Sequence, residues 1–337
     1  MVTIKDIAQI VNVSCTTVSN VINGKTGRVS EETIARINEV IEELGYVPNM
    51  SARSLVSNSS KVIGFINHSV IRKDAPFMED PFHSAFINAI EATLREHGYY
   101  LMVRTTETAQ DLKTFLLNWN VDGLFFIGIF EGDFLSVLKT FPIPVVLIDS
   151  YGISPDLCNI GLEDFKGSYL AARHLIENGH RQIAFASPTI HSKGVVFERF
   201  SGYKKALAES GIPFNRDYVY QTEMDIESSI AVGKEIAAQG AITGIVCTAD
   251  ILAAGIMAGI KTQGKRIPED ISIVGFDDLT ISRLTSPALS TIHQDAHLKG
   301  TLAVDYMLEQ LEDKRPPRPN IILPVYLIER DSVKKIG

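Results

Sequence analysis

A run of short polar side chains near the amino terminus has the chemistry to read DNA. From Ser14 to Asn23 the outer positions carry only Ser, Cys, Thr and Asn, with neither Lys nor Glu. Side chains this short let a helix approach base edges closely. There, Asn can pair with adenine through two hydrogen bonds, and Thr can hydrogen-bond a base or touch a thymine methyl group. The segment therefore predicts a DNA-reading helix.

Gly24-Lys25-Thr26, at the end of the same segment, could instead belong to a nucleotide-binding loop. That loop has another glycine five residues before the glycine of its GKT sequence. The residue at that position is Ser19. The mismatch argues against a phosphate-binding loop and favours a helix.

Capping residues indicate three short helices, of which the DNA-reading segment is the second. The first begins at Thr3, with Asp6 placed to complete a capping box, and the second begins at Ser14. The third begins at Ser30 and stops before Gly45. Because very few residues join the first two helices, we expect a helix-turn-helix unit. The apolar side chains that we expect to form its core are Ile4, Ile7, Ala8, Val11, Val18, Val21, Ile22, Ile34, Ile37, Ile41 and Leu44.

The segment after Pro48 predicts a second, smaller DNA-binding element. Asn49 can begin one or two helical turns that run through Leu55, and Ser and Asn residues follow. Nucleation costs more than so few turns return, so this helix would form only against a partner. On DNA, Leu55 could wedge between base steps of the minor groove. A flexible linker is the alternative that the composition leaves open.

From Lys61 onward, short apolar runs alternate with amphipathic helices, as in KVIGFI, FHSAFINAIEATLREHG and YLMV. This alternation is typical of parallel sheets flanked by helices. REHGYYLMV and IENGHRQIAF share one plan, a helix closed by Gly and followed by a strand, which suggests two similar lobes. Two such sheets that face each other would bind a small ligand at the carboxyl ends of their strands. The residues that follow predicted strands are His68, Asp149, Ser187, Met224, Asp250 and Asp277.

Several of these segments resemble the lactose repressor (LacI/GalR) family of bacterial transcription regulators. TIKDIAQIVNVSCTTVSNVING, GRVSEET and GYVPNMSARSL are similar to the head and hinge of that family, and DGLFFIG, ERFSGYKKAL, ISIVGFDD and LSTIHQD to its core. The family core is similar to periplasmic sugar-binding proteins. The resemblance implies a homodimeric repressor that binds a near-palindromic DNA operator. It also implies that a small metabolite, a sugar or sugar derivative, binds between the lobes and changes operator affinity.

The expected fold class is α/β, with a three-helix helix-turn-helix head, a hinge helix, and a two-lobed core similar to periplasmic binding proteins that holds two parallel doubly wound sheets. The head is expected at residues 1–48, the hinge helix and linker at 49–60, and the effector-binding and dimerisation core at 61–337. Within the core, the expected lobes are about 61–155 plus 291–320, and about 160–288 plus 321–337.

The resemblance also implies which residues contact the operator. Cys15, Thr16 and Asn20 take the positions that contact bases, and Leu55 takes the place of the minor-groove lever. The full set of expected DNA contacts is Thr3, Ser14, Cys15, Thr16, Thr17, Ser19, Asn20, Asn23 and Arg28 in the head and Asn49, Ala52, Arg53 and Leu55 in the hinge. Residues 1–60 hold five Lys or Arg against six Asp or Glu. We therefore expect few phosphate contacts and a modest dependence of affinity on salt.

Arg199 in ERFSGY and Asp277 in GFDD match the positions at which the family holds its effector. Arg offers a rigid fork of donors, and Asp can accept from two neighbouring sugar hydroxyls. Alternatively, Arg199 could pair with Glu198 on a helix surface, and Asp277 and Asp278 could cap the following turn. Ala249 stands where many sugar-responsive members carry Asn, so the effector loses the hydrogen bonds of that amide. The further expected effector contacts are Asp149, Phe82, His83 and Met224.

The composition argues against several other classes of protein. Hydrophobic residues make up 45% of the chain and charged residues 21%, as in ordinary globular proteins. No apolar run approaches the length of about 18 residues that a membrane span needs, and MVTIKDIAQI lacks the pattern of a signal peptide. We therefore expect a cytoplasmic protein with no membrane partner. The net charge of −8 argues against wholesale coating of nucleic acid, and the three scattered cysteines predict neither a disulfide nor a zinc site.

Two patterns that could indicate a metal or catalysis are incomplete. His293 and His297 are four residues apart, but HQDAH lacks the Glu of the zinc-protease motif. The chain has neither a G-x-S-x-G nor a G-x-G-x-x-G motif. We therefore expect no metal, no cofactor and no enzymatic activity. A sugar enzyme on the same sheets would need paired catalytic carboxylates in the cleft, and a transport-type binding protein would need a signal peptide.

Overall fold

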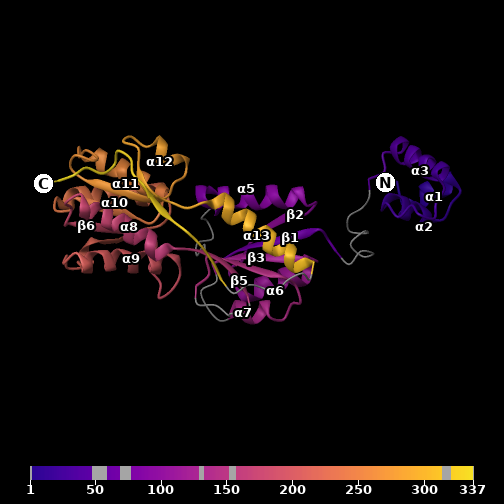
Figure 1. Cartoon of the computed structure of the whole chain (residues 1–337), viewed down its shortest axis with the longest axis horizontal. Helices are drawn as coiled ribbons and strands as arrows, with labels where there is room; N and C mark the ends of the chain where they lie inside the picture. The colour runs from indigo at the N-terminus through magenta and orange to yellow at the C-terminus, as the bar shows by residue number, and fades with distance from the viewer. Residues whose placement is uncertain are drawn as a thin grey trace. The chain divides into compact units, whose positions relative to one another are not determined.

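The chain divides into an amino-terminal unit of residues 1–60 and a core of residues 61–337 (Figure 1). The computed structural model describes residues 2–47, 59–68, 77–128, 133–151, 157–312 and 320–336. Within these ranges, every helix is too short or too polar to cross a membrane. We call the described residues 2–47 the head.

The head consists of the three helices α1 (Ile4–Val11), α2 (Cys15–Ile22) and α3 (Glu31–Glu43). The predicted capping box at the start of α1 is confirmed. The backbone N–H of Thr3 donates to the Asp6 carboxylate at 2.8 Å, and the Thr3 hydroxyl accepts from the backbone N–H of Asp6. The hydrogen bonds from Thr3 lower the pKa of Asp6, which favours its charged form at the positive end of the helix.

The turn between α1 and α2 depends on one residue in a left-handed conformation. Asn12 has a φ of 56°, which is tolerated by Asn better than by most residues. Ser14 then begins α2, and its hydroxyl accepts from the backbone N–H of Thr17 at 3.1 Å. At the other end of α2, Gly24 has a φ of 70°, as predicted for the residue that stops this helix.

The apolar faces of the three helices meet in one small core. Its buried members are Ile7, Ala8, Val11, Val18, Val21, Ile37 and Val40, and its partly buried members include Ile4, Ile22, Ile34 and Ile41. The prediction for Leu44 is wrong, because its side chain is 36% exposed. Leu44 lies at the C-cap of α3, beyond the last full turn, and Val40 provides the buried contact one turn earlier.

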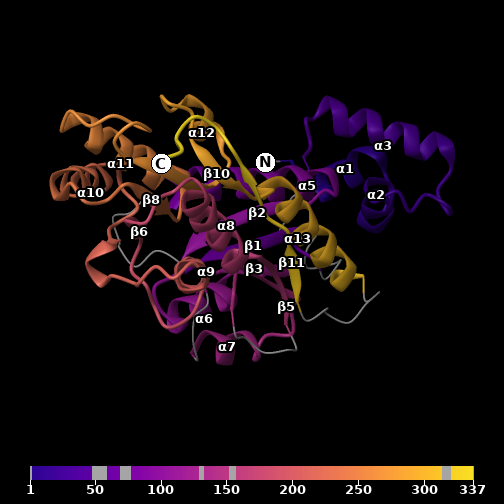
Figure 2. The same cartoon turned by 60° about the vertical axis from the view of Figure 1, so that its left-hand side comes forward.

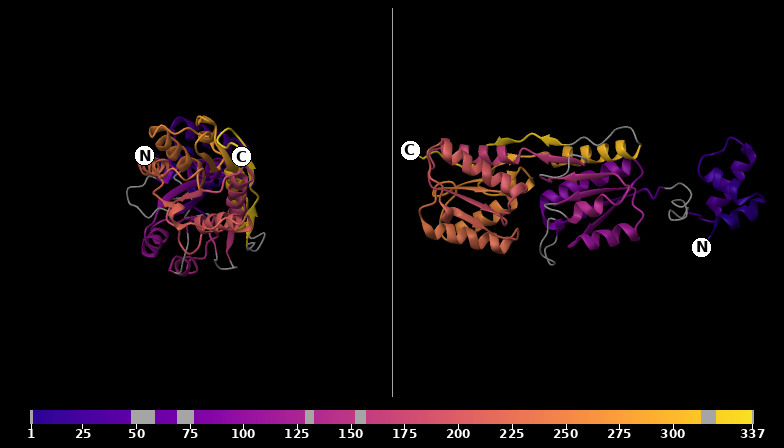
Figure 3. Two further views of the ribbon diagram at one scale, coloured as in Figure 1. Left: turned by 90° about the vertical axis from the view of Figure 1, so that its left-hand side faces the viewer. Right: turned by 90° about the horizontal axis from the view of Figure 1, so that it is seen from below.

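The core contains two parallel-dominated sheets, one in each lobe, with helices on both faces (Figure 3). We call the lobe built on the first sheet the first lobe. Its strands run in the order β11-β5-β4-β3-β1-β2, and all their pairings are parallel. The elements of the first lobe are β1 (Val62–Asn67), η1 (Phe77–Glu79), α5 (Pro81–Glu96), β2 (Tyr100–Thr105), α6 (Ala109–Asn118), β3 (Gly123–Ile127), α7 (Asp133–Leu138), β4 (Val145–Ile148), β5 (Cys158–Leu162), α13 (Ala296–Leu311) and β11 (Ile321–Leu323).

The second lobe is built on a sheet of order β12-β10-β9-β8-β6-β7, in which only β12 is antiparallel to its neighbour among the described strands. Its elements are α8 (Asp164–Glu177), β6 (Ile183–Ser187), α9 (Val195–Glu209), η2 (Arg216–Tyr218), β7 (Val219–Gln221), α10 (Ile226–Gln239), β8 (Gly244–Cys247), α11 (Asp250–Thr262), β9 (Ser272–Asp277), α12 (Thr280–Leu284), β10 (Ser290–His293) and β12 (Tyr326–Ile328). In this lobe α8 packs against α9, and α10 against α11.

The lobe boundaries differ from the predicted ones at three short segments. Residues 160–162 and 321–323 were expected in the second lobe, but they pair with each other in the first sheet. Residues 291–293 were expected in the first lobe, but β10 pairs with β9 in the second. The pattern of a short apolar strand beside a crossover does not show which sheet it joins, so these assignments needed the pairing itself.

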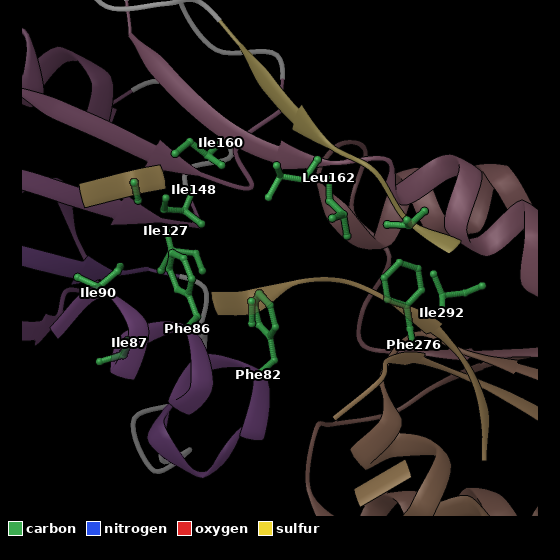
Figure 4. Packing of buried hydrophobic residues seen from close by; sticks show 14 of the residues in the cluster. Phe82, Phe86, Ile87, Ile90, Ile127, Ile148, Ile160, Leu162, Phe276 and Ile292 are labelled. Carbon is green, nitrogen blue, oxygen red and sulfur yellow. The ribbon is translucent and has the colours of Figure 1, made fainter. Parts of the chain in front are cut away.

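The crossing segments bring helix α13 back onto the first lobe, where it packs along α5 (Figure 2). Gly300 allows this close approach, since a Cβ atom there would lie 2.7 Å from the Cβ of Ala89 and 3.1 Å from a backbone oxygen of α5. Apolar side chains of both lobes join in one packed cluster at the junction. Figure 4 shows part of that cluster, with Phe82, Phe86, Ile148 and Ile160 from the first lobe and Phe276 and Ile292 from the second.

Candidate functional site

The outer face of α2 presents the side chains that were predicted to read DNA. Cys15 and Thr16 are exposed in its first turn, and Asn20 is half-buried one turn later. Among the described residues, none of these three side chains has a recorded hydrogen-bond partner within the chain. Their polar atoms therefore remain available to a ligand such as a base edge.

Other predicted DNA contacts in the head hold the helix itself. The hydroxyls of Ser14 and Thr17 are hydrogen-bonded to each other at 2.9 Å, and the Asn23 amide donates to the backbone oxygen of Ser19 at 2.7 Å. Thr3 serves the capping box of α1. Of the remaining predicted contacts, Arg28 is exposed, and Asn49, Ala52, Arg53 and Leu55 lie outside the described residues.

In the core, a series of hydrogen bonds runs from the first lobe to the second, and it includes residues that the sequence predicted and residues that it did not. We call this series the chain Asp149–Lys299–Gln294–Asp277. Asp149 follows β4 and accepts from the Lys299 ammonium at 2.7 and 2.8 Å through its two carboxylate oxygens. Lys299 lies in the first turn of α13, and only 1% of its surface is exposed. The ammonium also donates to the Gln294 amide oxygen at 3.5 Å. The amide nitrogen of Gln294 donates to Asp277 Oδ1 at 2.6 Å, at the end of β9.

Two aspartates of this hydrogen-bonded series have unusual backbone conformations. Asp149 has a φ of 49° and Asp277 a φ of 118°, values that residues other than glycine rarely adopt. Such residues cost on the order of 1 to 3 kcal/mol each and gather at binding sites. Asp277 is also buried, and this burial raises its pKa well above the ordinary value even though the positive charge of Arg199 opposes the shift. The site therefore keeps a carboxyl group that is costly to ionise.

Arg199 lies beside this chain, at the start of α9. Its Nε donates to Asp164 Oδ1 at 2.7 Å, its Nη1 donates to the backbone oxygen of Thr248, and its guanidinium carbon is 3.5 Å from the centre of the Phe276 ring. The Tyr151 hydroxyl donates to the second oxygen of Asp164. Arg199 is only 7% exposed. The alternative of a surface pair with Glu198 is therefore wrong, because the arginine is buried and its partner is Asp164.

Two protein-family models match parts of the chain. Residues 3–49 match the family described as "Bacterial regulatory proteins, lacI family", and residues 172–333 match a "Periplasmic binding protein-like domain". The chain is 34% identical over 344 residues to the "HTH-type transcriptional repressor PurR" of Mannheimia succiniciproducens, and the match covers 100% of both chains. The chain belongs to the lacI family of bacterial regulatory proteins.

The chain is also similar to other repressors of the lacI family. The PurR repressor of Aliivibrio salmonicida is 35% identical over 343 residues. A solved structure of the lac repressor dimer bound to operator and the anti-inducer ONPF matches 99% of this chain and 99% of its own, with a TM-score of 0.85 and 27% identity. Like these relatives, the chain is a DNA-binding transcriptional repressor and not an enzyme. The expected family and α/β fold class are confirmed.

The other predicted effector residues of the lacI-family core differ in whether they contact the inter-lobe site. Phe82 is buried near the start of α5, and the Lys299 ammonium lies 5.2 Å from the centre of its ring. His83 Nδ1 lies 3.2 Å from the Asp80 carboxylate, and its ring is tilted against that of Phe77, with 4.1 Å between the ring centres. Met224 is 38% exposed, and no hydrogen bond or ring contact recorded for the described residues joins it to the Arg199 group. The structure therefore brings Phe82 to the inter-lobe site, whereas no recorded contact within the described residues links Met224 to it.

Two acidic residues near the site have structural partners. Asp250 is fully buried at the start of α11, where it accepts from the Thr291 hydroxyl at 2.6 Å and from the backbone N–H of Leu279 at 3.0 Å. Burial raises the pKa of Asp250 to about 7. Asp278 accepts from Arg330 and lies 2.9 Å from a ring nitrogen of His293. Within the described residues, no three or more His, Cys, Asp and Glu side chains are grouped as a metal site.

Sequence reasoning did not find Lys299, Gln294, Asp164 or Tyr151 as members of the inter-lobe site. The only available signal was Lys299 itself. Its neighbours on one face of α13, Ala296, Gly300 and Ala303, are buried, so a lysine at that spacing interrupts an otherwise apolar face. A lysine on a buried face needs an anionic partner, but the sequence does not show which carboxylate provides it.

Proposed function

We propose that the chain represses transcription as a homodimer and that a small metabolite, a sugar or sugar derivative, binds between the lobes and changes its affinity for an operator. The observation that carries this proposal is the buried chain Asp149–Lys299–Gln294–Asp277. It joins the carboxyl ends of two parallel-dominated sheets, where small ligands bind in folds of this kind. A ligand inserted there must act on contacts of both lobes at once.

We assign the functional regions as a head at residues 1–48, a hinge at 49–60 and a core at 61–337. The division of the chain near Ser60 supports the boundary between hinge and core. The similarity to the lac repressor, which was solved as a dimer bound to operator, supports the dimer and the DNA partner. Two heads would then read two half-sites of a near-palindromic duplex in successive major grooves.

Within the head, we assign base reading to Cys15, Thr16 and Asn20. Cys15 and Thr16 are exposed, Asn20 is half-buried, and none of the three has a recorded internal partner in the described chain, which supports this assignment. The remaining residues of the predicted DNA set would position the head on the phosphate backbone or hold α2, and the predicted hinge residues, with Leu55 as the lever, would enter the minor groove.

In the core, we assign effector binding to Arg199 and Asp277, with Phe82, Asp149 and His83 around them. Only Oδ1 of Asp277 has a recorded donor among the described residues, so Oδ2 can share a hydrogen bond with a ligand hydroxyl. The Phe82 ring offers an apolar surface of the kind that packs on a sugar face. Met224 is 38% exposed and has no recorded hydrogen bond or ring contact to these groups within the described residues, which leaves it as a weaker candidate.

The DNA assignment is tested by selecting binding sites from a random pool of duplexes with the full-length chain. We expect enrichment of a near-palindromic site. The Asn20→Ala variant should lose discrimination at one base position per half-site, by about 1 to 3 kcal/mol. Glu43→Gln on α3 is the matched control, and it should change affinity for all sequences equally. A wild-type chain that enriches no site over random competitor contradicts the proposal.

The effector assignment is tested by a thermal-unfolding screen of the wild-type chain against sugars, sugar phosphates and nucleobases. A ligand that binds the folded state raises the unfolding temperature by an amount that grows with the logarithm of its concentration relative to its dissociation constant. We expect stabilisation by a member of the sugar group. Stabilisation by nucleobases alone would reject the sugar as effector, but it would leave the proposal of an effector-controlled repressor in place.

A further inference from the structure

We propose that the Lys299–Asp149 ion pair makes the inter-lobe site selective for an uncharged effector that is rich in hydrogen-bonding groups, and that the site excludes phosphates and carboxylates. The inference rests on the proposed function in one respect, namely that the effector binds at this site. It names the chemical class of that effector and the residue pair that selects it.

Both buried cations of the site are already matched by a carboxylate. The Lys299 ammonium contacts both oxygens of Asp149, at 2.7 and 2.8 Å, and its remaining recorded contact is the Gln294 amide oxygen. The Arg199 guanidinium contacts Asp164 at 2.7 Å and the backbone oxygen of Thr248. An anionic ligand would have to displace one of these carboxylates, because neither cation presents uncompensated positive charge.

The carboxyl groups of the site outnumber its cations. Asp149 and Asp164 match Lys299 and Arg199 one for one, and Asp277 is a third buried carboxyl group, whose raised pKa disfavours its charged form. Asp80, at the start of α5, adds a further negative charge that acts on Asp277, with His83 as its own partner. A phosphate or carboxylate placed here would therefore find no unmatched cation, and it would lie near the negative charges of the paired carboxylates in a medium that screens them poorly.

The hydrogen-bonding capacity that remains suits a neutral ligand. Asp277 Oδ2 has no recorded partner among the described residues, and it can share a hydrogen bond with a ligand hydroxyl whether the carboxyl group is neutral or charged. Thr248 is only 4% exposed, its hydroxyl has no hydrogen-bond partner in the described chain, and its backbone oxygen contacts Arg199. A buried hydroxyl without a partner is costly, so a ligand that bonds to it gains affinity. The rings of Phe82 and Phe276 provide apolar surface beside these groups.

If Asp149 neutralises Lys299, removal of its charge should create an anion site. Asp149→Asn leaves the buried ammonium without a carboxylate, while the amide occupies nearly the same volume. Lys299 would then take an anion from solution, since a buried charge without a partner is strongly unfavourable. A purely structural role for the pair predicts only a loss of stability in this variant, without any response to anions.

The test measures thermal unfolding of the full-length wild type, Asp149→Asn and the double variant Asp149→Asn/Lys299→Met in increasing inorganic phosphate, with KCl at matched ionic strength as reference. Phosphate stabilises most proteins weakly by exclusion from their surface, and the double variant reports that background. We expect the wild type to follow the background. Asp149→Asn should show an additional, saturable rise of about 3 °C at tenfold excess over its dissociation constant.

The proposal is overturned if phosphate raises the unfolding temperature of the wild type saturably and by more than that of the double variant. It is also overturned if Asp149→Asn folds and its unfolding temperature responds to phosphate no more than that of the double variant. Should Asp149→Asn fail to fold, the comparison of the wild type with the double variant, which lacks both charges, still decides whether the native site takes an anion. Binding-site selection by the wild type is scored separately. Loss of that selection would reject the proposed regulator, whereas the phosphate result alone addresses the ion pair.

Discussion

At the scale of single residues, Arg199 has contacts that hold the fold, and we propose that the same side chain binds the effector. Its Nε and Nη1 hold Asp164 and the end of β8, and its planar face lies on Phe276. These contacts fix the guanidinium in one orientation before any ligand arrives. A group held in this way loses little conformational entropy on binding, which favours affinity.

Arg199→Ala should abolish stabilisation by the effector and also lower the free energy of unfolding by about 3 to 5 kcal/mol, since Asp164 remains buried without its cation. Thermal and urea unfolding, each with and without the effector found by the screen, measure both effects. In the control Arg199→Ala/Asp164→Ala, part of the stability should return while the effector response stays absent. A double variant that regains the response would show that Arg199 only holds Asp164.

At the scale of elements, the second lobe depends on helices that touch through glycine. Gly233 on α10 and Gly259 on α11 face each other, and a Cβ atom at Gly233 would lie 2.2 Å from the backbone oxygen of Ile256. Gly233→Ala should therefore force the two helices apart and lower the free energy of unfolding by about 1 to 3 kcal/mol, despite the higher helix propensity of Ala.

Urea unfolding of the core measures this effect. Ala258→Ser, at an exposed position of α11, is the control and should change the free energy of unfolding by no more than about 0.5 kcal/mol. A Gly233→Ala variant as stable as the wild type would mean that the helices can separate at no cost.

The elements of the head could be predicted closely because their signals are local. Thr3, Asp6 and Ser14 act within one helical turn, and the period of the apolar residues fixes the inner face of each helix. Leu44 was misplaced because the period continues past the residue at which α3 ends. In the core, the alternation of strands and helices predicted two sheets, whereas the sheet joined by β10 or β11 depends on pairing between residues far apart in the sequence.

The inter-lobe site could be predicted only in part, for the same reason. Arg199, Asp149 and Asp277 were found from motifs or from their position after a strand. Lys299 and Gln294 lie at a crossing segment, and they become site residues only because α13 returns to the first lobe beside α5. No local pattern contains that return.

At the scale of the whole molecule, regulation requires that the effector binds two arrangements of the lobes with different affinity. A ligand that binds both equally well cannot change operator binding, however tightly it binds. The chain Asp149–Lys299–Gln294–Asp277 is a contact that an altered lobe arrangement would have to rearrange, since it joins residues of both lobes. We therefore place the effector-dependent difference in free energy at this chain.

The central claim is that a metabolite bound in the core controls how tightly the head holds its operator. It is tested most directly by titrating a labelled duplex of the selected operator with the full-length chain, with and without the effector found by the screen, at one salt concentration near 0.15 M, roughly the physiological value. We predict that saturating effector changes the dissociation constant by about 5- to 150-fold, the range of ordinary allosteric coupling. Identical dissociation constants with the effector bound and absent would contradict the account.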